Sequence, residues 1–165
     1  MPGRVAERHK WLNVPYDSGV AFCAHPDAHR AAMSVTASYL VHADDKRERD
    51  QVDWMPEVSR RARGFAVCAA LRSLGRRGVA ELVGRCCAHA RRFGEELGAA
   101  GATVLNDVVL NQVLVRFGDG EFGGTEWDGE HAMRVSVWNW RTTDEDVERS
   151  LRAILAAAEL GMVRA

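Results

Sequence analysis

The chain has 165 residues, with 22 lysine and arginine side chains against 23 aspartate and glutamate side chains, and a formal net charge of -1. This length fits one domain with a modest core, and the balanced charge excludes a strong overall attraction to nucleic acid or to an acidic membrane surface. No run of about 18 apolar residues occurs, and the first residues lack the apolar segment of a secretory signal. We therefore expect a cytoplasmic protein without nucleic-acid or membrane partners.

The first third of the chain predicts short elements separated by turns. A turn-like stretch over residues 13–18 precedes a short apolar run at 19–24, which is typical of a buried strand. Residues 28–33 are compatible with a short helix. The charge-dense residues 44–53 have few apolar anchors, and they predict a mobile loop ahead of Pro56.

Two helices are predicted in the middle of the chain. The first begins near Pro56 and ends near Gly75, which follows the usual placement of proline at a helix start and glycine after a helix end. The second has apolar residues every three or four positions and ends at Gly98. We expect its apolar face to enter the core through Val79, Leu82, Val83, Cys86, Ala90, Phe93 and Leu97.

Strands and a last helix occupy the C-terminal part of the chain. Alternating or short apolar runs predict strands over residues 103–105, 112–117 and 132–137. Thr142 and Glu145 have the spacing of a capping box, so we expect the last helix to begin there. The order of these elements predicts a mixed α/β fold.

The cysteines and histidines form no strong metal-binding motif. No Cys-x-x-Cys pair occurs, so we expect free, buried thiols at Cys23, Cys68, Cys86 and Cys87. A zinc site that uses Cys86, Cys87 and His89 is an alternative, although Cys86 continues the apolar helix stripe and tetrahedral sites need four converging ligands. The arginines between residues 60 and 77 are expected to form a solvated helix face, because the aromatic interleaving typical of nucleic-acid surfaces is missing.

Lys10 is the most informative residue of the sequence. Lysine occurs only at Lys10 and Lys46, and Lys10 stands between the imidazole of His9 and the indole of Trp11, shortly before the predicted buried strand. Partial desolvation there would lower the pKa of the amine and favour its attack on a carbonyl group. The spacing alone also allows an ordinary surface lysine whose aliphatic stem covers the indole ring.

Several segments of the chain, in order, carry a family resemblance. They are HKWLNVPYDSG at residues 9–19, DWMPEVSRR at 53–61, LRSLGRRG at 71–78, GTEW at 124–127 and AMRVS at 132–136. Their order and spacing resemble the group II pyridoxal-phosphate-dependent decarboxylases, the family of aromatic-amino-acid, glutamate and histidine-type decarboxylases. The resemblance implies part of a fold type I structure. Residues 1–75 would be the end of the large, cofactor-binding domain with its active-site loop, and residues 76–165 the small α+β domain.

The resemblance also implies roles for individual residues. Lys10 matches the lysine that forms the Schiff base with pyridoxal phosphate, and His9 matches a neighbour of the cofactor phosphate. Arg134 matches a small-domain arginine that contacts the substrate carboxylate in some members, and a guanidinium suits this role because it binds a carboxylate through two parallel hydrogen bonds. A structural ion pair at the strand edge is the alternative for Arg134. Residues 44–53 match the active-site loop, where Gln51 stands at the position of the tyrosine that often serves as proton donor.

The function that the resemblance implies is decarboxylation of an L-amino acid to an amine, a carboxy-lyase reaction with pyridoxal phosphate as cofactor. Family members are dimers with active sites at the subunit interface, so we expect a homodimer or a partner that supplies the N-terminal half. Family chains are several times longer, and in them the groups that hold the pyridine ring and most phosphate ligands precede the lysine. The alternative is therefore a non-catalytic, truncated remnant or a split-subunit module of such an enzyme.

Overall fold

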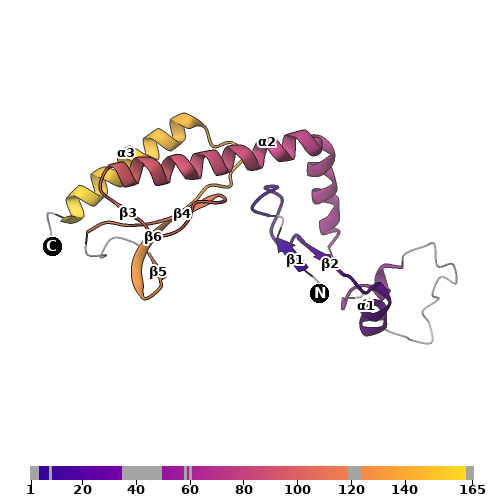
Figure 1. Cartoon of the computed structure of the whole chain (residues 1–165). Coiled ribbons are helices and arrows are strands. Elements are labelled where there is room, and N and C mark those ends of the chain that lie inside the picture. Colours follow the sequence, from indigo (N-terminus) through magenta and orange to yellow (C-terminus); the bar gives the residue numbers. More distant parts are fainter. Residues whose placement is uncertain are drawn as a thin grey trace.

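The computed structural model describes residues 4–7, 9–34, 50–57, 59, 61–118 and 124–162. Figure 1 shows an elongated arrangement, with a four-stranded sheet and two helices at one end and a β-hairpin with a short helix at the other. The long helix α2 (Arg63–Ala99) connects the two ends and bends along its length. In the described part of the chain, no helix combines the length and the apolar character needed to cross a membrane.

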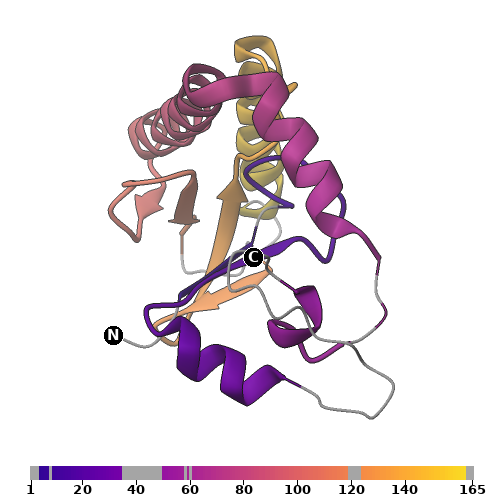
Figure 2. The ribbon, with the colours of Figure 1, turned by 90° about the vertical axis from the view of Figure 1, so that its right-hand side faces the viewer.

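The N-terminal part consists of a hairpin, a short α-helix and one turn of 3₁₀ helix. Strands β1 (Arg4–Glu7) and β2 (Gly19–Phe22) pair in antiparallel orientation. Helix α1 (Pro26–Met33) buries none of its side chains, and among the described elements it packs only against the 3₁₀ helix η1 (Gln51–Asp53). Figure 2 shows α1, η1 and the hairpin below the first half of α2.

The strand predicted at residues 19–24 forms as β2, but the prediction that it is buried is wrong. Its residues are exposed or half-buried, and Phe22 is 57% exposed. Among the described strands only β1 pairs with it, and a two-stranded hairpin has no second layer that covers its faces. Two of the predicted buried thiols are exposed as well, namely Cys23 and Cys68.

Helix α2 consists of two helical stretches that join at Gly75. The backbone there has φ 62° and ψ −176°, a conformation that glycine adopts far more readily than other residues. Two helices meeting near this glycine were predicted from the sequence, and this is confirmed. The first stretch begins at Arg63 and not at Pro56, since the described side chains from residue 57 to residue 62 are all exposed and no packing stabilises a helix there.

The four-stranded sheet is antiparallel throughout, with the strand order β3-β4-β6-β5. Its strands are β3 (Thr103–Val104), β4 (Gln112–Arg116), β5 (Thr125–Trp127) and β6 (Glu130–Ser136). Three of them match the predicted strands to within two residues. Strand β5 was not predicted, and it joins β6 through a tight turn in which both Asp128 and Gly129 have positive φ.

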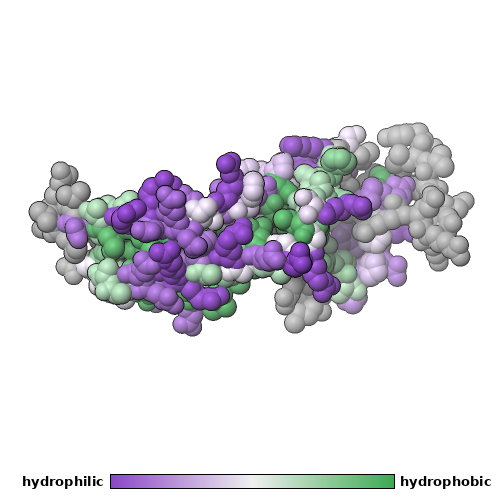
Figure 3. Space-filling model, turned by 90° about the horizontal axis from the view of Figure 1, so that it is seen from above, coloured by the Kyte–Doolittle hydropathy of each residue, from purple (hydrophilic) through white to green (hydrophobic). Residues whose placement is uncertain are grey.

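The core lies where the second half of α2 and helix α3 (Asp144–Met162) cover the sheet. It is formed by Leu82, Cys86, Ala90, Phe93, Leu97, Ala102, Val113, Val115, Phe117, Val137, Val147, Leu151 and Ala158. Five of the seven residues predicted for the apolar face of the second helix are thus confirmed, whereas Val79 and Val83 are half-buried. Hydrophilic side chains cover much of the outward face of the helices (Figure 3), as expected for amphipathic helices over one core.

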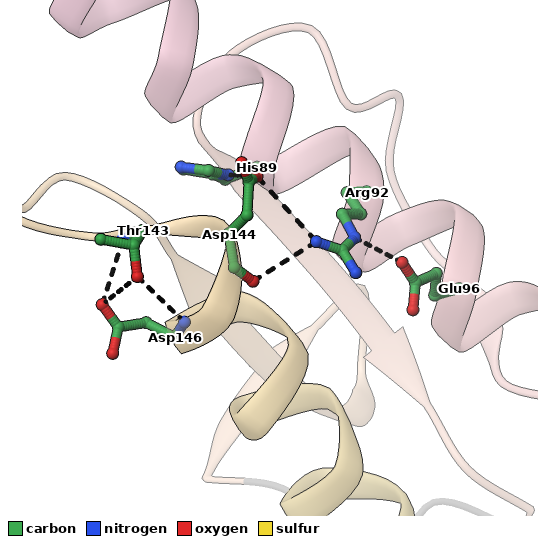
Figure 4. Close-up of polar contacts among 6 residues, drawn as sticks. All are labelled: His89, Arg92, Glu96, Thr143, Asp144 and Asp146. Atoms are coloured by element: carbon green, nitrogen blue, oxygen red, sulfur yellow. Dashed lines mark hydrogen bonds and ion pairs between the residues drawn. The ribbon is translucent and has the colours of Figure 1, made fainter.

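The capping pair of α3 lies one residue later than predicted. The side chain of Thr143 accepts a hydrogen bond from the backbone N–H of Asp146 at 3.2 Å, and the Asp146 carboxylate accepts one from the backbone N–H of Thr143 at 3.1 Å (Figure 4). This pair, the α3 cap, replaces the predicted pair Thr142 and Glu145, because Thr142 belongs to the preceding turn and donates to the carbonyl of Asn139. The backbone and side-chain hydrogen bonds from Thr143 lower the pKa of Asp146.

Candidate functional site

Lys10 lies on the turn between β1 and β2, which we call the lysine turn (residues 9–16). Its side chain is exposed, whereas the apolar residues that follow it point inward. Leu12 and Val14 are each only 8% exposed, and Trp11 packs against the core of the sheet. The turn is therefore anchored by its apolar side chains and presents Lys10 on the surface. The expectation that Lys10 is partly buried is wrong, because the residue is exposed and, among the described elements, only β1 packs against β2.

His9, the residue before Lys10, makes an aromatic contact within the lysine turn. Its imidazole is half-buried and lies against the ring of Tyr16, with the ring centroids 4.7 Å apart and the planes tilted by 33°. Such a contact restricts the orientation of the imidazole, and Tyr16 itself remains 73% exposed. The lysine turn thus carries an imidazole of restricted orientation and a primary amine on consecutive residues.

Asn13 closes the lysine turn, and its role was missed in the sequence analysis. Its backbone has φ 50°, in the left-handed region, and its side-chain amide contacts the carbonyl of Lys10 and the segment that follows β6. The one available signal was an asparagine in a turn-like stretch, since asparagine tolerates positive φ better than most residues. The distant partners of its side chain give no signal in the sequence.

A cavity of about 900 Å³ lies between the end of this turn, η1 and the start of α2, and Asp17, Gln51 and Arg63 are among its lining residues. Arg63 lies 3.7 Å from the carboxylates of both Asp17 and Glu57, so it bridges the turn to the segment before α2. Gln51, the residue at the position of the family's loop tyrosine, therefore faces a space shared with the chain just after the lysine turn. Residues 44–49 of the predicted active-site loop lie outside the described residues.

Arg134 lies in a different place, on β6 opposite Leu114 of β4. It is exposed and lines a second cavity of about 540 Å³ between β6, α2 and α3, which it shares with Asp146 and Ser150. Lys10 is not among the residues that line this cavity. None of the ion pairs among the described residues involves Arg134, and the alternative of a structural ion pair therefore finds no carboxylate in that part of the chain.

The alternative zinc site is not formed by the described side chains, among which no three His, Cys, Asp or Glu residues are grouped to hold a metal ion. Instead, His89 faces the first turn of α3, with its Nδ1 3.5 Å from the carboxylate of Asp144. Arg92 lies 3.9 Å from the same carboxylate (Figure 4), so these residues join α2 to α3. Cys86 and Cys87 are buried, and burial raises the pKa of the Cys86 thiol, which fits packing roles.

Known proteins match this chain over most of its length. Residues 5–117 match the family model described as the pyridoxal-dependent decarboxylase conserved domain. The aromatic-L-amino-acid decarboxylases of Drosophila lebanonensis and Drosophila melanogaster are 25% and 24% identical to it over 170 residues, which cover 92% of this chain. The matches cover 42% and 33% of those two proteins, so the chain spans less than half the length of the curated relatives.

A solved structure shows the same fold. The crystal structure of Catharanthus roseus tryptophan decarboxylase in complex with L-tryptophan superposes with a TM-score of 0.78 at 16% identity, over 95% of this chain and 39% of that one. The fold is therefore part of the fold type I structure of pyridoxal-phosphate enzymes, as the motifs predicted, and pyridoxal phosphate is the cofactor of the family. Because the family model matches well over half of its residues, the chain belongs to the pyridoxal-dependent decarboxylase family.

Proposed function

We propose that this chain is the C-terminal part of a pyridoxal-phosphate-dependent L-amino-acid decarboxylase, a carboxy-lyase that converts an amino acid into an amine and carbon dioxide. The observation that carries the proposal is the placement of Lys10. It lies within the segment that matches the family, exposed on an anchored turn and directly after His9 in the sequence, whose imidazole packs against Tyr16. The names of the relatives make aromatic L-amino acids the first substrates to assay.

The donor groups of the lysine turn fit the aldehyde and phosphate ends of the cofactor. Lys10 is exposed, so a carbonyl compound can reach its side chain without unfolding of the turn, which Trp11, Leu12 and Val14 anchor. The His9 imidazole can donate a hydrogen bond to a phosphate oxygen. When bound, pyridoxal phosphate withdraws electrons from the substrate carbon that loses its carboxylate. Lys10 would thus hold the cofactor and His9 would orient it.

Arg134 is the residue that we assign to the substrate carboxylate. Its exposed guanidinium can bind a carboxylate through two parallel hydrogen bonds, and no described carboxylate pairs with it. Since its cavity does not include Lys10, this assignment is tested separately. Arg134→Gln is expected to raise the KM for the amino acid and to leave labelling of Lys10 by the cofactor unchanged. An unchanged KM would contradict the assignment.

Borohydride trapping tests the assignment of Lys10. The purified chain is incubated with pyridoxal phosphate, reduced and digested, and the adduct is mapped by mass spectrometry. Lys46 is the internal control, since lysine occurs nowhere else in the sequence. A selective adduct on Lys10 that Lys10→Arg abolishes is the expected result. Equal, slow labelling of both lysines would show two ordinary surface amines and would contradict the proposal.

A second candidate function, a non-catalytic or split-subunit module, is favoured by apolar side chains on the hairpin and on the first half of α2. Phe65 is 80% exposed, Phe22 57% and Leu71 45%. Exposed apolar groups of this size mark surfaces that another polypeptide covers. Selective trapping at Lys10 without turnover by the chain alone would support this candidate, whereas an amine produced from an amino acid by the chain alone would exclude it. Light scattering then tells whether two copies of the chain pair.

A further inference from the structure

We propose that Asn13 is a positioning residue, which fixes the orientation of Lys10 by tying the lysine turn to residues 138–140 beyond β6. This inference rests on the proposed function, because it takes Lys10 as the lysine that holds the cofactor. Asn13 contacts Trp138 and Trp140, which lie far from it in the sequence. The segment after β6 would therefore help to position Lys10.

The side-chain amide of Asn13 makes three hydrogen bonds to main-chain groups. Its Nδ2 donates to the carbonyl of Lys10 and, at 2.7 Å, to the carbonyl of Trp138, while its Oδ1 accepts from the backbone N–H of Trp140 at 2.7 Å. Both amide hydrogens are therefore used. The partners also determine which end of the amide is which, because a backbone N–H can only donate and a carbonyl can only accept.

The backbone of Asn13 holds the same turn from a second direction. Its N–H donates to the Lys10 carbonyl at 3.3 Å, and its positive φ of 50° folds the chain back so that the side chain reaches that carbonyl as well. One residue thus fixes the Lys10 peptide twice. A shift of residues 138–140 would move the Lys10 carbonyl and, with it, the Cα from which the amine extends.

Residues 138–140 are in turn tied to α2 and follow a residue that is bonded to the segment before β4. Arg85 of α2 donates to the carbonyl of Trp140 at 2.9 Å. Just before the segment, Val137 donates its N–H to the carbonyl of Asn111 at 2.9 Å, and the Asn111 side chain donates to the carbonyl of Val137 at 2.8 Å. The backbone of Trp140 is therefore held at its N–H by Asn13 of the lysine turn and at its C=O by Arg85 of α2, so this segment links the turn to α2.

Two substitutions separate the hydrogen bonds of Asn13 from its backbone conformation. Asn13→Asp keeps the size and the acceptor for Trp140, but it places a carboxylate oxygen against two carbonyl oxygens, so both donated bonds are lost. Asn13→Gly removes all three bonds and accepts the positive φ without strain. A common effect of both variants therefore reports the lost bonds and not backbone strain.

The experiment measures the rates at which pyridoxal phosphate and borohydride label Lys10 and Lys46 in the full chain. Both Asn13 variants are expected to lower the Lys10 rate about tenfold, because a fixed backbone at Lys10 restricts the positions that its amine can take, and to leave the Lys46 rate unchanged. Asn106→Asp is the matched control. Asn106 also bonds main-chain groups through both ends of its amide, to Gln112 and Leu114, and it should leave the Lys10 rate unchanged.

Circular dichroism and thermal unfolding establish that each variant is folded. A general loss of stability would not change the Lys10 rate selectively, so the ratio of the Lys10 rate to the Lys46 rate reports the role of Asn13. If both Asn13 variants fail to fold, Arg85→Gln carries the test from the far side of Trp140, with an expected drop of about threefold in the same ratio. Wild-type protein without selectivity for Lys10 would contradict the proposed function itself. Selectivity that persists in the Asn13 variants, or an equal loss in Asn106→Asp, would overturn only the role of Asn13.

Discussion

The attachment of α1 to η1 depends on one buried carboxylate. The Asp53 side chain is 2% exposed, and it accepts hydrogen bonds from Arg30 Nε at 2.8 Å and from Ser34 Oγ at 3.0 Å. His29 adds a hydrogen-bond contact to the carbonyl of Trp54 at 2.9 Å. Since α1 buries no side chain of its own, we expect these polar contacts to supply most of the free energy that holds the helix in place.

The substitution Asp53→Asn keeps the size of the side chain and removes its charge. Hydrogen bonds to a charged group contribute about 1.5–3 kcal/mol each, and the Arg30 side chain is 47% exposed, so solvent screening shifts its contribution toward the low end. We expect the free energy that holds α1 to η1 to fall by about 2 kcal/mol, which corresponds to a roughly 30-fold rise in the local opening equilibrium.

Hydrogen exchange followed by mass spectrometry measures this opening directly. Peptides covering residues 26–34 should exchange roughly 30-fold faster in the variant, whereas peptides covering 82–97 should be unchanged, because no core residue contacts α1 among the described elements. Asp107→Asn, the same change at an exposed aspartate far from α1, is the control. A wild-type exchange rate over residues 26–34 would refute the reasoning, and so would faster exchange throughout the chain.

Three further predictions concern the kink, the thiols and pH. Gly75→Ala should lower the free energy of unfolding in urea by about 1–3 kcal/mol, because φ is 62° at this position. Gly84→Ala, in regular helix where no described side chain crowds the added methyl group, should raise it by about 0.5–1 kcal/mol. Equal effects of the two substitutions would contradict the kink. Iodoacetamide should label the exposed Cys68 well before Cys86, whose pKa burial raises, and equal rates would contradict the packing. The hydrogen bonds of the α3 cap lower the pKa of Asp146, so its carboxylate stabilises the folded state above the ordinary carboxyl range. The Tm difference between wild type and Asp146→Asn should thus be present at neutral pH and disappear as the pH falls through that lowered pKa; persistence at lower pH would contradict the cap.

Local patterns in the sequence were enough for most of the elements. The apolar spacing from Leu82 to Leu97, the glycine at the kink and the alternation in β4 each predict a conformation from neighbouring residues, and the structure confirms them. The family assignment also follows from the sequence, since its motifs keep their order along the chain. The position of the α3 cap was wrong by one residue because two consecutive threonines offer the same local signal, and only the turn before the helix selects Thr143.

The sequence by itself determined that Lys10 is the distinctive amine, that it precedes a turn and a strand, and to which family the chain belongs. The tertiary structure decided its surroundings. Whether β2 is covered, whether Arg134 shares a pocket with Lys10 and what Asn13 contacts all depend on segments up to about 125 residues away. Propensity and periodicity act over a few residues, whereas burial and long-range hydrogen bonds arise only when whole layers pack together. For that reason, the exposure of Lys10 and its connection to residues 138–140 through Asn13 could be seen only in the folded chain.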